Sequence, residues 1–263
     1  MDLGIKGKIA IVAASSKGIG LAAAKKLAEE GANVVICSRN EENLRIAETE
    51  LKKVSIGEVL AIKCDVTQKA DIESLVDKTV DHFGTVHILV NNAGGPPAGY
   101  FEDFDDDAWF KAFELNFMSA VRFIRKVLPL MKSQKWGRII NITSVTVKQP
   151  IDNLILSNSI RMAVVGLAKT LALQLAEYNI TVNNIAPGYT LTSRVRSLVE
   201  TRAKERGVEF EKIVEELVKE VPAKRMADPS EIGNAVAFLA SEAAGYITGV
   251  TLFVDGGYVK ATL

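Results

Sequence analysis

Cysteine is scarce in this chain, and the two cysteines present do not form a recognisable site. Cys37 and Cys64 are the only ones among 263 residues. Both lie in apolar runs typical of strands, without metal-ligand spacing or a disulfide framework around them. We therefore expect no metal site. Two buried free thiols fit a reducing compartment, which favours a cytoplasmic location.

An excess of charge of either sign is also absent. Lys and Arg together number 32, Asp and Glu together also number 32, and the formal net charge at pH 7 is zero. A surface without a net positive field does not attract a polyanion over a long range. We therefore expect no nucleic acid among the partners of this protein.

Segments typical of export or membrane insertion are missing as well. The N-terminus leads directly into a strand and a Gly-rich turn, without a basic region, a long apolar region and a cleavage site in sequence. No apolar run approaches the length of a membrane span. We expect no membrane partner.

The pattern that is present is a regular alternation of short β-branched runs with longer segments of helical period. This alternation is typical of βαβ units, in which a parallel sheet is covered by helices on both faces. The predicted strands are Ile9–Ala13, Asn33–Ser38, Glu58–Cys64, His87–Asn91, Arg138–Thr143, Thr181–Ala186 and Thr251–Val254. The predicted helices are Ile19–Glu30, Glu41–Val54, Lys69–Phe83, Asp107–Ser133, Asn153–Tyr178 and Pro229–Ala240. We predict a single α/β domain over residues 1–263, with a doubly wound parallel sheet of about seven strands.

A charged segment, Ser193–Pro222, differs from the rest of the chain. It is helical in period and follows the sixth predicted strand. An insertion after the carboxyl end of a strand lies where a lid over the ligand crevice would sit. The alternatives are an oligomer contact or a solvated helical pair.

A Gly-rich turn connects the first strand to the first helix. Its glycines allow the backbone to approach a pyrophosphate, and the helix N-terminus directs free N–H groups at the negative charge. The strand before the turn and the helix after it predict a Rossmann-type dinucleotide site. The residues expected to form it are Ala14, Ser16, Lys17, Gly18, Ile19 and Gly20.

The same turn, AASSKGIG, resembles the TGxxxGxG element of the short-chain dehydrogenase/reductase family, and further matches follow in order along essentially the whole chain. They are Asp65-Val66, Asn91-Asn92-Ala93-Gly94, Asn116, Ser144, Pro187-Gly188, Gly245-Tyr246-Ile247-Thr248-Gly249 and Val254-Asp255-Gly256-Gly257. The overall plan is similar to the 3-oxoacyl-carrier-protein reductase branch. The resemblance implies a homo-oligomer, a dimer or tetramer, built through the two long helices and the last strand. It also adds cofactor-binding residues, namely Asp65, Val66, Asn91, Ala93, Gly94, Pro187, Gly188, Thr190 and Thr192.

Two positions in this cofactor set need comment. Ala14 stands where the family has its first glycine, and a methyl group is tolerable there if the backbone stays at negative φ, so we expect a slightly altered turn. Asp65 is expected near the adenine amino group, and the alternative is a helix cap.

The end of the second strand indicates which dinucleotide binds. An acid there would bond the ribose 2′-hydroxyl and repel a 2′-phosphate, but this strand ends in Ser38 and Arg39. Arg39 can stack on the adenine and bond the phosphate, and Lys17 can add a second cation. We therefore expect NADP(H), although both could be solvated surface bases.

The resemblance also implies four catalytic positions. Family members use a Tyr as proton donor, a Lys four residues later that holds the nicotinamide ribose and lowers the Tyr pKa, a Ser that orients the substrate oxygen, and an Asn that anchors a water relay. By position, Ser144 and Asn116 retain the last two. Ser157 occupies the Tyr position and Arg161 the Lys position.

This exchanged pair changes the available chemistry. A phenol has a pKa of about 10 that a cation can lower, whereas a Ser hydroxyl is a far weaker acid, so Ser157 does not simply replace the Tyr. Arg161 keeps the positive charge and can still bond ribose hydroxyls. Other proton-donor candidates are Tyr189 and Tyr100, although each is more often an aromatic pocket wall.

Two functions follow. The first is an NADP(H)-dependent oxidoreductase that acts on a small carbonyl/alcohol pair with a non-standard proton donor, favoured by Ser144, Asn116 and the lid-like insertion. The second is an NADP(H)-binding protein without redox turnover, a sensor or a structural subunit, favoured by the loss of the Tyr and Lys.

Overall fold

A single seven-stranded sheet forms the centre of the computed structural model, which describes residues 2–262. Its strand order is β3-β2-β1-β4-β5-β6-β7, and every neighbouring pair is parallel. The strands are β1 (Ile9–Val12), β2 (Asn33–Ser38), β3 (Val59–Lys63), β4 (Ile88–Asn91), β5 (Gly137–Ile142), β6 (Ile180–Pro187) and β7 (Thr251–Val254). The order reverses between β1 and β4, so the crevice of a doubly wound fold opens at their carboxyl ends. The predicted fold class is confirmed.

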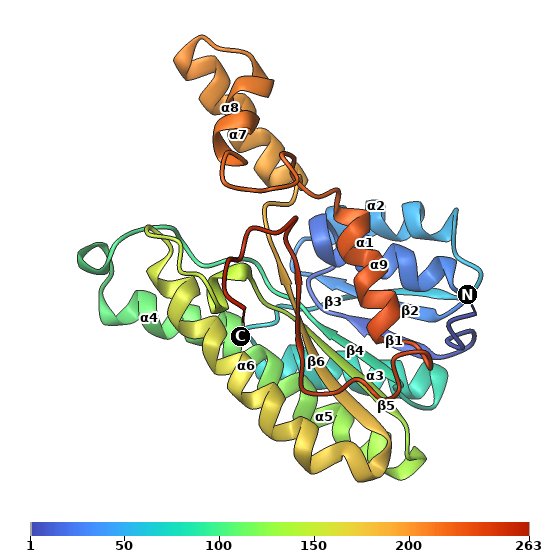
Figure 1. Cartoon of the computed structure of the whole chain (residues 1–263). Coiled ribbons are helices and arrows are strands. Elements are labelled where there is room, and N and C mark those ends of the chain that lie inside the picture. The colour runs from blue at the N-terminus through green and yellow to red at the C-terminus, as the bar shows by residue number, and fades with distance from the viewer. Residues whose placement is uncertain (1, 263) are drawn as a thin grey trace.

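Helices cover both faces of this sheet (Figure 1). On one face lie α1 (Gly18–Glu29), α2 (Glu41–Lys52) and α9 (Pro229–Leu239), and on the other lie α3 (Lys69–Phe83), α5 (Ser119–Gln134) and α6 (Ile155–Leu175). The remaining helices are α4 (Asp106–Phe113), α7 (Ser193–Arg206) and α8 (Phe210–Leu217), with short turns η1 (Phe101–Asp103), η2 (Glu114–Met118), η3 (Val145–Val147) and η4 (Ala176–Tyr178).

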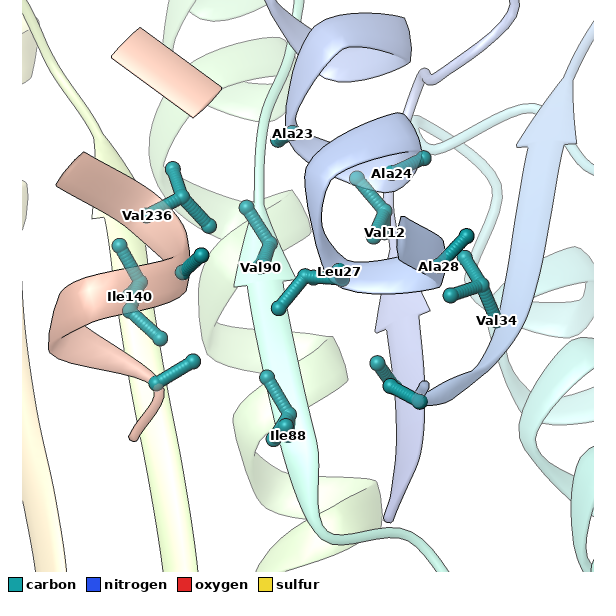
Figure 2. Packing of buried hydrophobic residues seen from close by; sticks show 14 of the residues in the cluster. Val12, Ala23, Ala24, Leu27, Ala28, Val34, Ile88, Val90, Ile140 and Val236 are labelled. Carbon is teal, nitrogen blue, oxygen red and sulfur yellow. The ribbon is translucent and has the colours of Figure 1, made fainter. Parts of the chain in front are cut away.

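Alternating strand residues supply two separate cores. Val12 and Val90 face the first helical layer, where they pack with Leu27 of α1 (Figure 2). Ile11 and Leu89 point to the second layer. Since successive side chains of a strand leave opposite faces, strands buried on both sides read as continuous apolar runs. This pattern fixes the register that brings the strand ends together.

The predicted helix Asp107–Ser133 forms as one helical run over α4, η2 and α5, but it is not α-helical throughout. A π-helical turn, η2, separates α4 from α5 and contains the buried Asn116. A π turn inserts one residue into the helical repeat, which rotates the side chains after it, and such turns are frequent at functional sites. The apolar period alone gives no sign of this insertion.

The inserted segment Ser193–Pro222 folds as a helical hairpin of α7 and α8 that projects from the body (Figure 1). Despite its charge, it contains an apolar seam of Val199, Ala203 and Ile213, and Arg206 pairs with Glu216 at 2.6 Å across the hairpin. Val195, near its start, reaches the crevice. The hairpin is therefore held partly by its own contacts.

Helix α6 with η4 (Ile155–Tyr178) is long and apolar enough to cross a membrane by length and composition, so the expectation that no run approaches this length is wrong. In the structure this helix packs along β6 and η3. Its outer face carries the exposed Met162 and Leu173, which raise its hydropathy. The core helix of a soluble protein passes the same test.

Candidate functional site

The Gly-rich turn after β1 provides a cradle of backbone groups. Gly20 is irreplaceable there, because an added Cβ would lie 2.6 Å from the Ala14 carbonyl oxygen and 2.6 Å from Nδ2 of Asn92. No side chain caps α1, which begins after Lys17, so the first N–H groups of the helix remain free for a ligand. This is the geometry that a dinucleotide pyrophosphate needs.

Ala14 departs from the expectation that its backbone stays at negative φ. Its φ is +46°, a left-handed conformation that costs a residue with a Cβ about 1 kcal/mol. Asn92 stabilises the turn, since its Nδ2 donates to the carbonyl oxygens of Ala13 and Ala14, each at 3.1 Å. The turn therefore keeps the backbone shape that a glycine would adopt, and the backbone of Ala14 is strained in it.

The ends of β2 and β3 present the groups predicted to select the dinucleotide. Ser16 Oγ donates to Ser38 Oγ at 3.0 Å, which ties the turn to β2. Arg39 is exposed, and its Nη1 lies 3.9 Å from Oδ2 of Asp65. Asp65 also accepts hydrogen bonds from the backbone N–H and hydroxyl of Thr67, so it shapes the loop before α3 and is not the N-cap of that helix.

Three further predicted cofactor residues follow β3 and β4. The Val66 side chain is buried in the core, so only its backbone can face a ligand. Ala93 also packs partly against this core. Gly94 is exposed, and a Cβ built on it would meet no atom within 4 Å, which leaves open space beside the turn.

A chain of buried amides crosses four strands behind the site. Asn91 donates to Asn141 at 2.8 Å, Asn141 to Asn184 at 3.0 Å, and Asn184 to Thr251 at 3.2 Å. Because every donation runs toward β7, Oδ1 of Asn91 has no partner within residues 2–262. This acceptor lines a small cavity of about 10 Å³.

Asn116 meets Asn91 at the same cavity. Its Nδ2 donates to the Gly94 carbonyl oxygen at 3.0 Å, and its buried Oδ1 has no partner in the described part of the chain. Arg161 lines the cavity as well. Two residues with an unpartnered acceptor and a cation therefore line one small polar cavity, and Asn116 does not line the cavity that holds Ser144 and Ser157.

A cluster of hydroxyls forms at the end of β5. Ser144 Oγ accepts from the backbone N–H of Thr146 at 3.2 Å, and Thr146 Oγ1 lies 3.2 Å from Ser157 Oγ on α6. Sequence reasoning missed Thr146, although its place two residues after Ser144 on η3 was a usable signal. The cluster places two hydroxyls of the predicted catalytic set near one another.

Arg161 lies one helical turn after Ser157 and is buried. Its Nη1 donates to the carbonyl oxygens of Ile142 at 3.0 Å and Thr143 at 3.1 Å. Burial lowers the pKa of its guanidinium to about 10, which keeps it charged at neutral pH. Within residues 2–262 no carboxylate lies within 4.0 Å of it.

A cavity of about 340 Å³ collects the predicted catalytic side chains except Asn116, together with six residues of the predicted cofactor set. Its walls include Ile19, Ser144, Ser157, Arg161, Pro187, Gly188, Tyr189, Thr190 and Thr192. Apolar residues that sequence reasoning missed complete it, namely Pro96, Val145, Ile151, Leu154 and Val195. The missed walls come from four separate segments, so no local pattern could identify them.

The two tyrosines considered as proton donors differ in position. Tyr189 lines the cavity, and burial together with the neighbouring phenol of Tyr258 raises its pKa. Tyr100 is exposed in the loop before η1 and is not among the residues that line the cavity. A raised pKa makes Tyr189 a weaker acid, which fits a wall better than a donor.

In the part of the chain that the structure describes, no group of three or more His, Cys, Asp or Glu residues could hold a metal ion. Cys37 and Cys64 are buried and free.

Comparison with known proteins agrees with this geometry. A family model described as Enoyl-(Acyl carrier protein) reductase matches residues 13–259. The chain is 35% identical over 255 residues to D-beta-hydroxybutyrate dehydrogenase of Rhizobium meliloti, covering 95% of this chain and 98% of the relative.

Solved structures agree as well. The crystal structure of L-sorbose reductase from Gluconobacter frateurii, in complex with NADPH and L-sorbose, superimposes with a TM-score of 0.96 at 36% identity, covering 99% of this chain and 100% of that one. A short-chain oxidoreductase from Pseudomonas aeruginosa, described as containing an atypical catalytic center, gives a TM-score of 0.91 at 31% identity and covers 97% and 98% of the two chains. Matches over nearly the whole length show that this chain belongs to the short-chain dehydrogenase/reductase family.

Proposed function

We propose that this family member is an NADP(H)-dependent oxidoreductase that acts on a carbonyl/alcohol pair and uses a proton donor other than the family's Tyr. The observation that carries the proposal is the cavity of about 340 Å³, which joins Ser144, Ser157 and Arg161 to the turn residue Ile19. The substrate-orienting groups therefore share this space with one residue of the dinucleotide cradle, while Ser16, Lys17 and Gly18 line a second cavity of about 880 Å³, and Thr192 lines both. The complex of L-sorbose reductase with NADPH and L-sorbose supports both ligand classes.

The residues present fit the dinucleotide. The free N–H groups at the start of α1 suit the pyrophosphate, and Lys17 and Arg39 suit a 2′-phosphate. Arg161 keeps Nε–H and Nη2–H₂ available for ribose hydroxyls. When bound, the cofactor supplies or accepts the hydride.

The hydroxyl cluster would handle the substrate oxygen. In the reducing direction negative charge develops on this oxygen, and hydrogen bonds from Ser144 and Ser157 together with the charge of Arg161 would stabilise it. Ser157 could donate its proton to the substrate oxygen, but a Ser hydroxyl is no stronger an acid than the product alcohol. We therefore expect slow turnover compared with a phenol-based site.

The choice of cofactor is tested by titration with NADPH and NADH. We expect NADPH to bind more tightly, and Arg39→Asp to reverse the order because an acid repels the 2′-phosphate and bonds the free 2′-hydroxyl. Arg45→Asp makes the same charge change on an exposed position of α2 and should preserve the preference. Equal affinity for the two cofactors in the unaltered protein would refute the charge argument.

Turnover is tested by a screen for NADPH consumption with ketones, aldehydes and acyl thioesters. The proposal is supported if the protein reduces compounds of any of these classes and if Ser144→Ala removes that activity while the affinity for NADPH is retained. The second candidate, NADP(H) binding without turnover, is favoured by the raised pKa of Tyr189 and the absence of a Tyr at 157. Tight NADPH binding with no turnover on any class would decide for that candidate.

A further inference from the structure

Arg161 is a buried cation without an anionic partner, and it faces a cavity. Only 8% of its surface is exposed, and none of the cavity's other lining residues within 2–262 is charged. Two carbonyl oxygens bind Nη1, but a carbonyl has no net charge. Burying an uncompensated charge is costly, so this position gains free energy from any anion that reaches it.

The unused donors of Arg161 are suited to a carboxylate. A guanidinium carries five N–H donors in a planar fork, and those on Nε and Nη2 have no partner in the described residues. The same fork matches the two oxygens of a carboxylate better than a compact ammonium does. Ribose hydroxyls of the cofactor can share these donors, but a hydroxyl is neutral and leaves the positive charge of Arg161 uncompensated.

The small residue at position 157 makes this cation accessible. Ser157 and Arg161 lie one helical turn apart and line the same cavity. A Ser side chain at 157 leaves more room beside Arg161 than a phenol ring would leave. The two residues therefore act together, since Ser157 leaves room beside Arg161 and Arg161 supplies the receptor for a carboxylate.

The remaining walls suit a small organic acid. Val145, Ile151, Leu154 and Val195 give an apolar lining, and Ser144 supplies a hydroxyl for the reacting oxygen. A compact carbon chain would contact the apolar walls, with its carbonyl at the hydroxyl cluster and its carboxylate at Arg161.

We propose that Arg161 binds a carboxylate of the substrate, so that the substrates are small oxo acids and the corresponding hydroxy acids. This inference rests on the proposed reductase function for the reacting carbonyl, whereas the anion site itself can be measured without turnover.

The test compares propionate with propionamide, which have nearly the same shape and differ in charge. Binding to the NADPH complex, and to the protein without NADPH, is followed by calorimetry and thermal unfolding. We expect propionate to bind at least roughly tenfold more tightly, as suits a charge-assisted pair. Arg161→Gln should abolish that preference, while Arg161→Lys should keep part of it. Lys148→Gln, which removes an exposed lysine on the loop after η3, is the matched control and should change nothing.

The outcomes separate this inference from the proposed function. Equal binding of propionate and propionamide to the unaltered protein overturns the inference whatever the variants do, and so does a preference that survives Arg161→Gln. Reduction of neutral ketones without a preference for oxo acids also overturns it, while the reductase function stands. A propionate preference lost in Arg161→Gln, with no NADPH consumption on any carbonyl, supports the anion site and refutes the reductase function.

Discussion

Ser157 and Arg161 set the chemistry of the site at the residue scale. Ser157 Oγ lies 3.2 Å from Thr146 Oγ1, and Arg161 is anchored on backbone carbonyls behind it. If carbonyl, Ser144 and nicotinamide keep the usual family geometry, the missing elements are an acid of suitable pKa at 157 and a compact cation at 161. These are properties of two side chains and leave the fold unchanged.

The double change Ser157→Tyr with Arg161→Lys should therefore create or raise reduction of neutral carbonyl compounds by NADPH. General acid catalysis contributes on the order of 10²–10⁴ in rate, which stands clear of assay noise. Neither single change should suffice, because Arg161→Lys supplies no phenol, and the guanidinium that Ser157→Tyr retains is delocalised and bonded to two carbonyl oxygens, so it should lower the phenol pKa less than a compact ammonium does. A folded, NADPH-binding double variant that reduces nothing would show that the cavity has lost more than its acid. In the otherwise unaltered protein, Tyr189→Phe tests whether the phenol of Tyr189 is the proton donor. Loss of turnover with NADPH binding intact would support that role.

At the end of the sheet away from the crevice, protonation of His87 is coupled to the stability of the fold. Its Nδ1 accepts from the Ile9 backbone N–H at 3.1 Å, and burial together with Lys8 lowers its pKa to about 4. The unfolded chain binds the proton near pH 6.5, whereas the folded chain resists it. Stability should fall as pH drops from about 6.5 to about 4, by on the order of 1–2 kcal/mol after allowance for solvent screening.

The measurement for His87 is the free energy of unfolding by urea at a series of pH values. His87→Gln, which cannot titrate, should lose this part of the pH dependence. His82→Gln is the matched control, because His82 is exposed and pairs with Glu58 on the surface. An unchanged pH slope in His87→Gln would refute the assignment.

Element boundaries were largely predictable because each strand has a continuous apolar run and each helix an apolar face. The predicted Asn33–Ser38, Lys69–Phe83 and Thr251–Val254 match the structure residue for residue. The π turn at Asn116 was not predictable, since a one-residue insertion leaves the apolar period almost intact. The positive φ of Ala14 was missed because the residue type argues against it.

The candidate site was predictable only where motifs identify it. Residues at strand ends, such as Ser144 and Arg39, follow from the topology. The amide chain of Asn91, Asn141 and Asn184 depends on pairings between strands 43 to 50 residues apart. Such pairings are set by tertiary register, which a single sequence does not display.

The α7–α8 hairpin is expected to be the element whose exchange behaviour depends most on ligand. It projects from the body (Figure 1), and Val195 together with the apolar cluster around Val199 connects it to the crevice side. Amide hydrogen exchange should be fastest here without ligand and slow when NADPH and a substrate are both bound. Helix α9, packed on α1, is the internal control and should stay protected throughout. Strong protection of α7–α8 in both states would assign it to a permanent interface.

On the scale of the whole molecule, two of the places where large apolar side chains are exposed combine several such residues. Phe110 of α4 and Met162 and Leu173 of α6 lie on adjacent helices, and 78% of the Leu173 surface is open. Residues 162 and 173 are eleven apart, close to three helical turns, so both project from one side of α6. Leu252 of β7, an edge strand of the sheet, and Tyr246 in the turn before this strand are exposed as well. Monomers rarely expose contiguous apolar areas without a use for them.

We expect these regions to join copies of this chain into a homo-oligomer. Light scattering of the unaltered protein after size exclusion should give a mass of two or four chains of 28.5 kDa. Leu173→Glu with Phe110→Glu should lower that mass, because each carboxylate would have to be desolvated in the interface. Ile56→Glu is the matched control, since Ile56 is 67% exposed on the loop before β3, away from both regions. A 28.5 kDa species for the unaltered protein at all concentrations tested, or an unchanged mass in the Phe110 and Leu173 double variant, would refute the assignment of this face. If Tyr246→Glu lowers the mass while that double variant does not, the contact lies at the β7 edge.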